Sequence, residues 1–110
     1  MTKSDRLLDD IVATIVKEVS PEKVILFGSH ASGTTHPDSD IDLLVVESEP
    51  FGAERSRRKE TARLSLALLP FRVPIDLLVF ARDEIDRWKD SANHVVARAL
   101  REGRALYERP

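Results

Sequence analysis

Two aspartates separated by one residue are the side chains in this sequence best suited to chemistry. Asp40 and Asp42 stand at the start of an apolar run, residues 43–46, which is typical of a buried strand. Because residues two apart on a strand point to the same side, we expect both carboxylates to face one way. Two convergent carboxylates repel each other unless a cation lies between them. The pair therefore predicts a site for a divalent metal ion.

A Gly-Ser pair precedes the aspartates and follows another apolar run. Gly28 and Ser29 come directly after residues 24–27, and a polar, turn-rich connection joins them to Asp40. Glycine lets an anion approach the backbone, and serine adds a hydroxyl beside backbone N–H groups. Alone, Gly-Ser also marks ordinary turns. Facing a pair of metal ligands, however, a phosphate-binding turn indicates phosphoryl or nucleotidyl transfer.

A third aspartate interrupts a later apolar run. Asp76 lies within residues 73–80, where a buried charge without a partner would be destabilising. One interpretation places it near the start of a strand and partly exposed. The other places this strand beside the one that begins at residue 41, so that Asp76 joins Asp40 and Asp42 around one or two Mg²⁺ ions. Asp76 would then be free to accept a proton from an attacking hydroxyl.

The elements that must position these residues follow from apolar spacing and turn signals. The expected order is helix, strand, strand, helix, strand, helix, helix, at residues 7–19, 23–27, 41–47, 54–69, 73–80, 83–89 and 92–102. In the second helix, Ala62, Leu66 and Leu69 are expected to face inward. Gly103 is expected at the usual C′ position of the last helix. Residues 105–107 form either a short edge strand or an ordered tail.

This order predicts an α/β (α+β) fold, a small mixed β-sheet with helices packed on it. The 110 residues are expected to form a single domain, 1–110. A net charge of −2 makes nucleic-acid binding by bulk charge improbable. The absence of cysteine and of any long apolar segment favours a cytoplasmic protein without a membrane span.

Three motifs together resemble the nucleotidyltransferase superfamily related to DNA polymerase beta. They are Gly28-Ser29, a ten-residue spacer followed by Asp40-Ile41-Asp42-Leu43, and Ile75-Asp76-Leu77. The chain length and residues 39–45 resemble, within that superfamily, the minimal nucleotidyltransferase (MNT) group. The resemblance covers about residues 23–80, and residues 102–107 are also similar. It implies a nucleotidyltransferase fold.

The resemblance also implies roles for the motif residues. Gly28 and Ser29 would hold the phosphates of ATP, Asp40 and Asp42 would ligate Mg²⁺, and Asp76 would complete the catalytic triad of carboxylates. Members of this group commonly pair with a small helical HEPN protein as a toxin–antitoxin system. The MNT chain then transfers AMP from ATP to a tyrosine of the HEPN RNase, which implies a hetero-oligomeric partnership.

The loop departs from the pattern of this group at one position. Ser32 stands where many members carry an arginine, which binds phosphate through two hydrogen bonds. The intact carboxylates favour activity, with a cation supplied from elsewhere. The alternative is a catalytically weak binding module that neutralises a HEPN partner by forming a complex.

Two further alternatives concern the substrate and the basic stretch 54–63. That stretch is expected to be a solvated helix face, and otherwise to bring arginines to the triphosphate or to meet an acidic partner. Transfer to a small molecule such as an antibiotic, as in larger relatives, is disfavoured because the chain has no second substrate-binding domain.

Overall fold

The chain folds into helices and short strands in mixed order. The computed structural model describes residues 3–28, 40–92 and 94–110. Its elements are α1 (Lys3–Val19), β1 (Lys23–Phe27), β2 (Ile41–Glu47), α3 (Arg57–Leu68), the 3-10 turn η1 (Leu69–Phe71), β3 (Ile75–Ala81), α4 (Arg82–Trp88), α5 (Val95–Glu102) and β4 (Arg104–Glu108). None of the described helices combines the length and the apolar character needed to span a bilayer.

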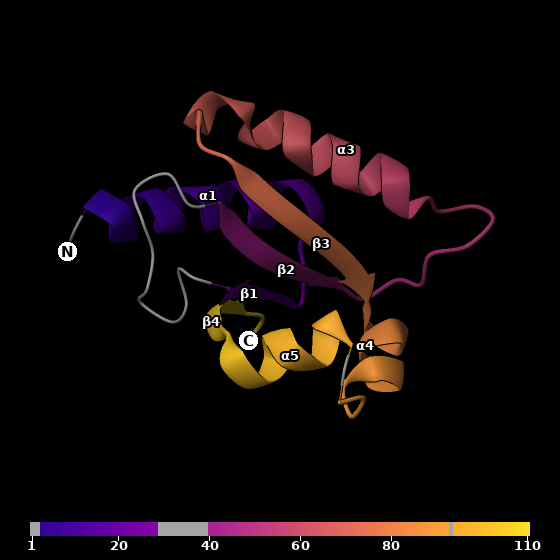
Figure 1. The fold of residues 1–110 in the computed structure, drawn as a ribbon. Coiled ribbons are helices and arrows are strands. Elements are labelled where there is room, and N and C mark those ends of the chain that lie inside the picture. Colours follow the sequence, from indigo (N-terminus) through magenta and orange to yellow (C-terminus); the bar gives the residue numbers. More distant parts are fainter. Residues whose placement is uncertain (1–2, 29–39, 93) are drawn as a thin grey trace.

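The strands form one mixed sheet in the order β3-β2-β1-β4 (Figure 1). β1 is antiparallel to both β2 and β4, whereas β2 and β3 are parallel. The link from β2 to β3 passes through α3, as a parallel pair requires. The sheet and its helices confirm the expected fold class, and β3 and β4 are the two edges.

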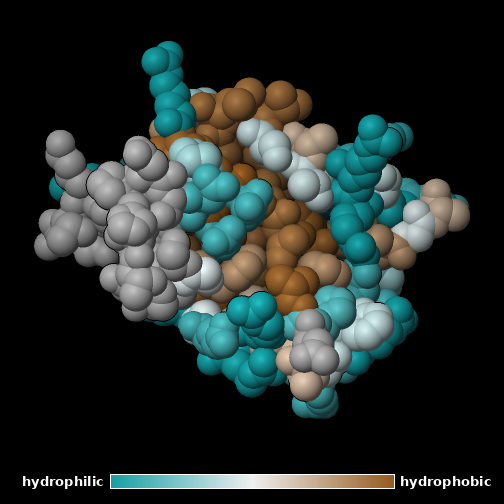
Figure 2. Space-filling view, in the orientation of Figure 1, coloured by the Kyte–Doolittle hydropathy of each residue, from teal (hydrophilic) through white to brown (hydrophobic). Residues whose placement is uncertain are grey.

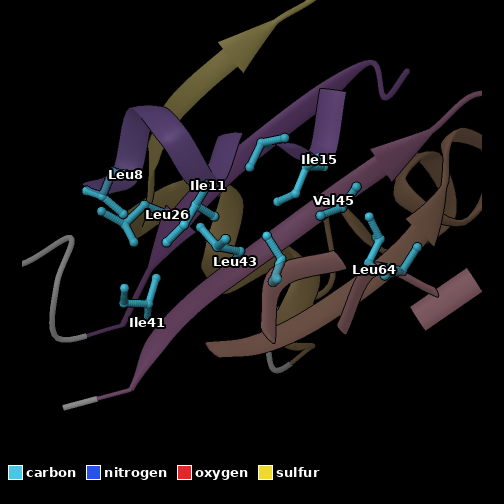
Figure 3. Close-up of a cluster of buried hydrophobic side chains, with 11 residues drawn as sticks. Leu8, Ile11, Ile15, Leu26, Ile41, Leu43, Val45 and Leu64 are labelled. Carbon is cyan, nitrogen blue, oxygen red and sulfur yellow. The ribbon is translucent and has the colours of Figure 1, made fainter. Parts of the chain in front are cut away.

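Helices cover both faces of the sheet, α1 and α3 on one side and α4 and α5 on the other (Figure 1). Alternation along β2 places Ile41, Leu43 and Val45 in the core under α1 and α3 (Figure 3). Leu44 and Val46 join the second core, under α4 and α5. Because both faces are covered, the strand is apolar at nearly every position, as its sequence predicted.

Several boundaries differ slightly from the sequence-based expectation. β1 and β2 begin and end where expected. Residues 105–107, expected as either an edge strand or an ordered tail, belong to the edge strand β4. α3 begins at Arg57 instead of residue 54, because Ser56 caps it by accepting a hydrogen bond from the Lys59 backbone N–H at 3.2 Å. Before it, Gly52 and Arg55 pair in an isolated β-bridge.

The expected inward face of α3 is wrong. Leu66 and Leu69 are 67% and 66% exposed and Ala62 is also exposed, whereas Leu64 and Leu68 are buried. The helix carries two leucine stripes with similar helical spacing, so periodicity alone does not choose between them. Packing against α1 and β3 buries the stripe that contains Leu64.

Gly103 ends α5, but not by the left-handed conformation that the C′ position usually requires. Its φ is −85°, which any residue adopts. A Cβ at this position would instead lie 2.6 Å from Ile25 Cγ2 and 2.8 Å from the Leu26 carbonyl oxygen. Glycine is therefore needed because the chain passes close to β1 on its way into β4.

Candidate functional site

Asp42 and Asp76 are neighbours across two parallel strands. The register pairs Ile41 with Ile75 and Asp42 with Asp76, and the Ile41 backbone N–H donates to the Pro74 carbonyl at 2.9 Å. Paired residues on adjacent strands lie about 5 Å apart and point to the same face. The two carboxylates therefore share one side of the sheet, at the end where β2 and β3 begin. Asp42 is half-buried and Asp76 is exposed.

Gly28 lies directly against Asp42. Phe27, the last residue of β1, pairs with Asp42, and the chain then turns at Gly28 with a φ of +73°. A Cβ at Gly28 would overlap the Asp42 carboxylate, with Cγ only 3.2 Å away. The absence of a side chain therefore lets the Asp42 carboxylate lie against the Gly28 backbone. The left-handed backbone suits glycine independently.

The other predicted site residues are less closely placed. Asp40 is exposed and directly precedes β2, two residues before Asp42. Ser29 and Ser32 lie outside the described residues. The structure thus brings Gly28, Asp42 and Asp76 together and leaves Asp40 at the rim of the same sheet end.

The carboxylates of Asp42 and Asp76 suit a hard divalent cation that takes its remaining ligands from water or substrate. Carboxylate oxygens suit Mg²⁺, which proteins commonly bind through one or two carboxylates plus substrate phosphates and water. In the part of the chain that the structure describes, no three Asp, Glu, His or Cys side chains are placed so that they hold a metal ion by themselves. Phosphate oxygens and water would complete such a shell around Asp42 and Asp76.

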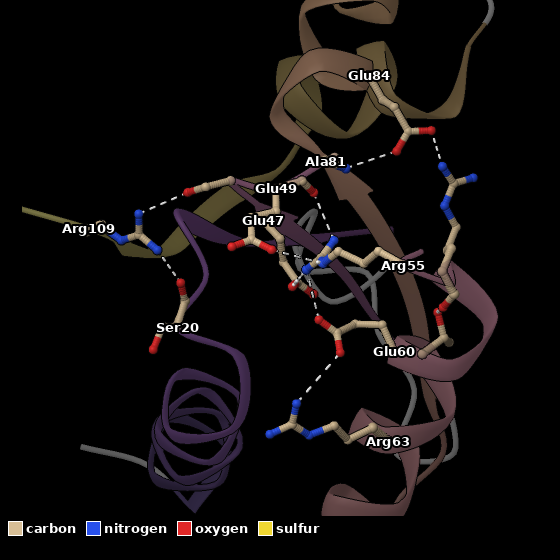
Figure 4. Close-up of polar contacts among 12 residues, drawn as sticks. Ser20, Glu47, Glu49, Arg55, Glu60, Arg63, Ala81, Glu84 and Arg109 are labelled. Carbon is tan, nitrogen blue, oxygen red and sulfur yellow. Dashed lines mark hydrogen bonds and ion pairs between the residues drawn. The ribbon is translucent and has the colours of Figure 1, made fainter. Parts of the chain in front are cut away.

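A second polar cluster lies at the opposite end of β2 (Figure 4). Glu47 is only 2% exposed and accepts a hydrogen bond from Arg55. The same guanidinium donates to Glu60 at 3.0 Å and to the Glu49 carbonyl at 2.8 Å. Arg55 also lies 4.3 Å from the centre of the Phe51 ring. The cluster ties the segment between β2 and α3 to the sheet.

Burial and, after it, the neighbouring Glu60 carboxyl raise the pKa of Glu47 to about 8, against the opposing effect of Arg55. One Glu47 oxygen, Oε2, is buried without a hydrogen-bond partner among the described residues. A proton on Glu47 relieves the repulsion between the two carboxyls. A cavity of about 590 Å³ adjoins this cluster, with Arg63 and Arg109 also in its lining.

The arginines near α3 pair with carboxylates other than the site aspartates. Arg55 binds Glu47, Arg57 binds Glu84, and Arg63 lies 3.4 Å from Glu18. Glu47 lies five residues after Asp42 in β2. At the usual rise of a strand, the two positions are about 17 Å apart. That these arginines replace the missing loop arginine at the triphosphate stays a prediction, and it would require each of them to leave the carboxylate that it binds here.

The sequence analysis missed the Glu47–Arg55 cluster. Its signal was an acid at the end of an apolar run, followed by a stretch rich in arginine and glutamate. That pattern is common at the surface, and only the closure of α3 over the end of β2 buries it. The cluster is structural, since its charges bind one another.

Comparisons with known proteins agree with this fold. A family model described as a nucleotidyltransferase domain matches residues 8–106. Among solved structures, a candidate nucleotidyltransferase from Sulfolobus solfataricus is 24% identical with a TM-score of 0.66; the match covers 96% of this chain and 80% of that one. No curated protein sequence matches the chain.

Two other similar structures are toxin–antitoxin complexes. One, solved with AMP-PNP, is 23% identical with a TM-score of 0.57, over 92% of this chain and 73% of that chain. The other, a mutant of the pair MntA–HpeT, is 20% identical with a TM-score of 0.61, over 92% of this chain and 72% of that chain. At these identities the likeness shows the fold alone.

Proposed function

Because this chain belongs to the nucleotidyltransferase domain family, we propose that it transfers AMP from ATP to a tyrosine hydroxyl of a HEPN RNase toxin and so acts as its antitoxin. The observation that carries this proposal is the pairing of Asp42 with Asp76 beside Gly28, a glycine with a left-handed backbone that lies against the Asp42 carboxylate. The proposal also takes residues 1–110 to be a single domain whose substrate is a separate partner protein.

The residues would act mainly by positioning. Asp40 and Asp42 would hold Mg²⁺, and Gly28 and Ser29 would hold the ATP phosphates. When bound, Mg²⁺, as one or two ions, neutralises charge on the triphosphate and on the leaving pyrophosphate. Asp76 would also ligate the metal and accept the proton of the acceptor hydroxyl. The acceptor oxygen bonds to the α-phosphorus, and the bond from that phosphorus to the bridging oxygen breaks, releasing pyrophosphate.

The choice of nucleotide and the choice of partner are supported by different observations from those that show the family. A complex with the same fold was solved with AMP-PNP, which supports an adenine nucleotide. Both complexes are toxin–antitoxin pairs, which supports a toxin as the acceptor. The HEPN identity of that toxin, its tyrosine and the use of Mg²⁺ come from the motif resemblance.

A mass measurement tests the proposed reaction. The chain is incubated with the HEPN protein encoded beside it, ATP and Mg²⁺, and the intact mass of the partner is measured. We expect one or more added AMP masses, lost with EDTA and reduced at least a hundredfold in rate by Asp42→Asn or Asp76→Asn. Asp90→Asn, an exposed aspartate in the turn after α4, is the matched control and should react as the wild type does.

The competing function is neutralisation by binding alone. It is favoured by Ser32 in the usual place of an arginine, and by the engagement of Arg55, Arg57 and Arg63 with carboxylates. Replacing Asp40 and Asp42 by alanine separates the two functions in a toxicity assay. Loss of neutralisation supports the enzyme, whereas full neutralisation without AMP transfer supports the binding module.

A further inference from the structure

The outer surface of α3 is apolar at one end. Leu66 and Leu69 are 67% and 66% exposed, and Ala62 lies beside them on the same side of the helix. A leucine that is two-thirds exposed gains little from folding, and neighbouring exposed leucines commonly mark a contact surface. Figure 2 shows a broad hydrophobic area that extends over this part of α3 and over β3.

The other end of this surface is basic. Arg58 and Lys59 are exposed and form no ion pair with any residue that the structure describes, unlike Arg57 and Arg63 nearby. The only acid of the helix, Glu60, turns inward to Arg55. The α3 outer surface, defined as Arg58, Lys59, Ala62, Leu66 and Leu69, therefore has apolar and basic groups without a compensating acid.

A groove continues this surface to the edge strand β3. It has a volume of about 240 Å³ and is lined in part by Leu69, Arg72, Ile75 and Leu77. Arg72 is exposed, adopts a left-handed backbone with φ of 56°, and likewise has no ion pair within the described ranges. Ile75 and Leu77 lie on the α3 face of β3, and Asp76, between them in the sequence, points to the opposite face. The groove thus ends at the strand that carries the exposed carboxylate.

We propose that the α3 outer surface and this groove dock an acidic, amphipathic segment of the acceptor protein. Its apolar side would cover Leu66 and Leu69, and its carboxylates would meet Arg58, Lys59 and Arg72. Because β3 is an edge strand, a protein held on α3 reaches Asp76 by passing over that edge. This inference rests on the proposed function, since it takes the acceptor to be a protein.

Paired substitutions test the two chemical components separately. Leu66→Ser with Leu69→Ser removes the apolar contact, and Arg58→Glu with Lys59→Glu reverses the charge. Binding of the HEPN partner is measured by calorimetry at low and high salt. We expect each variant to bind at least about tenfold more weakly than the wild type, and the charge variant to lose most of the salt dependence.

The matched controls are exposed residues on other helices. Val95→Ser removes an apolar side chain that is 41% exposed on α5, and Arg87→Glu reverses a charge on α4 that has no ion pair with another described residue. Both should bind the partner as the wild type does. All variants should keep the wild-type thermal midpoint and the wild-type affinity for AMP-PNP with Mg²⁺, because no site residue is changed.

The outcomes distinguish this inference from the proposed function. Wild-type binding affinity in both paired variants would overturn the docking surface and leave AMP transfer intact. Tight, surface-dependent binding without AMP transfer would overturn the enzymatic function and support the docking surface. A wild-type chain that does not bind the partner would overturn both. If the leucine variant instead converts a dimer of this chain to a monomer with partner binding unchanged, the surface joins two copies and the inference is wrong.

Discussion

At the residue scale, the candidate site depends on one close approach. Gly28 turns out of β1 in a left-handed conformation while its Cα lies against the Asp42 carboxylate. Asp42 in turn lies beside Asp76 through the parallel register. A side chain at Gly28 would displace the carboxylate that faces Asp76, so the glycine and the two aspartates form one geometric unit.

Gly28→Ala is therefore expected to reduce AMP transfer at least tenfold and to destabilise the fold by about 1–2 kcal/mol, the usual penalty for a left-handed alanine. Transfer is measured by partner mass and stability by urea denaturation. Gly52→Ala is the control, because a Cβ there has nothing within 4 Å. Equal transfer by the two variants would contradict the role assigned to Gly28.

Glu47 makes stability depend on pH. Burial and Glu60 raise its folded-state pKa to about 8, above the ordinary value of 4.5. The folded protein therefore holds this proton more tightly than the unfolded chain does. Its contribution to stability is complete below about pH 4.5 and is lost as the pH rises to about 8.

Glu47→Gln keeps an acceptor for Arg55 and supplies a permanent N–H donor for Glu60. We expect the free energy of unfolding of this variant to fall less than that of the wild type between pH 5 and pH 9. Denaturation curves at several pH values measure the difference. The control Glu49→Gln changes a carboxylate whose side chain is 80% exposed, and it should retain the wild-type slope. Parallel pH profiles for all three proteins would refute the assignment.

At the element scale, α3 has two separate uses. Leu64 and Leu68 join the core with α1 and the sheet, while Glu60 closes the Arg55 cluster. The opposite side carries the exposed leucines and the cations of the α3 outer surface, which form no ion pair with the described residues. One helix therefore stabilises the sheet with one side and presents the proposed docking surface with the other.

Alanine substitutions distinguish the two sides of α3. Leu64→Ala removes a fully buried side chain and should destabilise the protein by about 2–5 kcal/mol. Leu66→Ala should change stability by less than about 0.5 kcal/mol, since its side chain is already in water. Urea denaturation of both variants measures the difference. A larger loss for Leu66→Ala would restore the inward face expected from the sequence.

At the scale of the whole molecule, the two polar clusters occupy opposite ends of β2. The aspartate end opens to solvent at Asp76, whereas the Glu47 end is closed by Arg55 and α3. Apolar residues of both cores, including Leu44 and Val45, separate the ends. Chemistry at one end is therefore physically separate from the charge network at the other.

This separation predicts additive effects. Glu47→Gln and Asp76→Asn are far apart, so the stability change of the double variant should equal the sum of the single changes within about 0.5 kcal/mol. Glu47→Gln alone should leave the rate of AMP transfer within about twofold of the wild type. A strong coupling energy, or a large loss of transfer in Glu47→Gln, would show that the ends communicate.

The sequence by itself determined the local elements and the residues worth testing. Uninterrupted apolar runs placed β1 and β2 to the residue, because a strand covered on both faces has few polar positions. Gly28-Ser29 and the pair Asp40 and Asp42 indicated phosphoryl or nucleotidyl transfer, and the motif resemblance, which includes Asp76, favoured nucleotidyl transfer. These conclusions depend on residue types within short segments of the chain, so they can be drawn without the fold.

Only the tertiary structure decided what depends on distant packing. The parallel register that pairs Asp42 with Asp76 is set between strands joined through α3. Two leucine stripes of similar spacing left the buried side of α3 undecided until α1 and β3 covered one of them. Glu47 likewise became a buried acid only when Arg55 and Glu60 closed over it. Which side chains are buried depends on the assembled fold, and the spacing of apolar residues along one segment does not determine it.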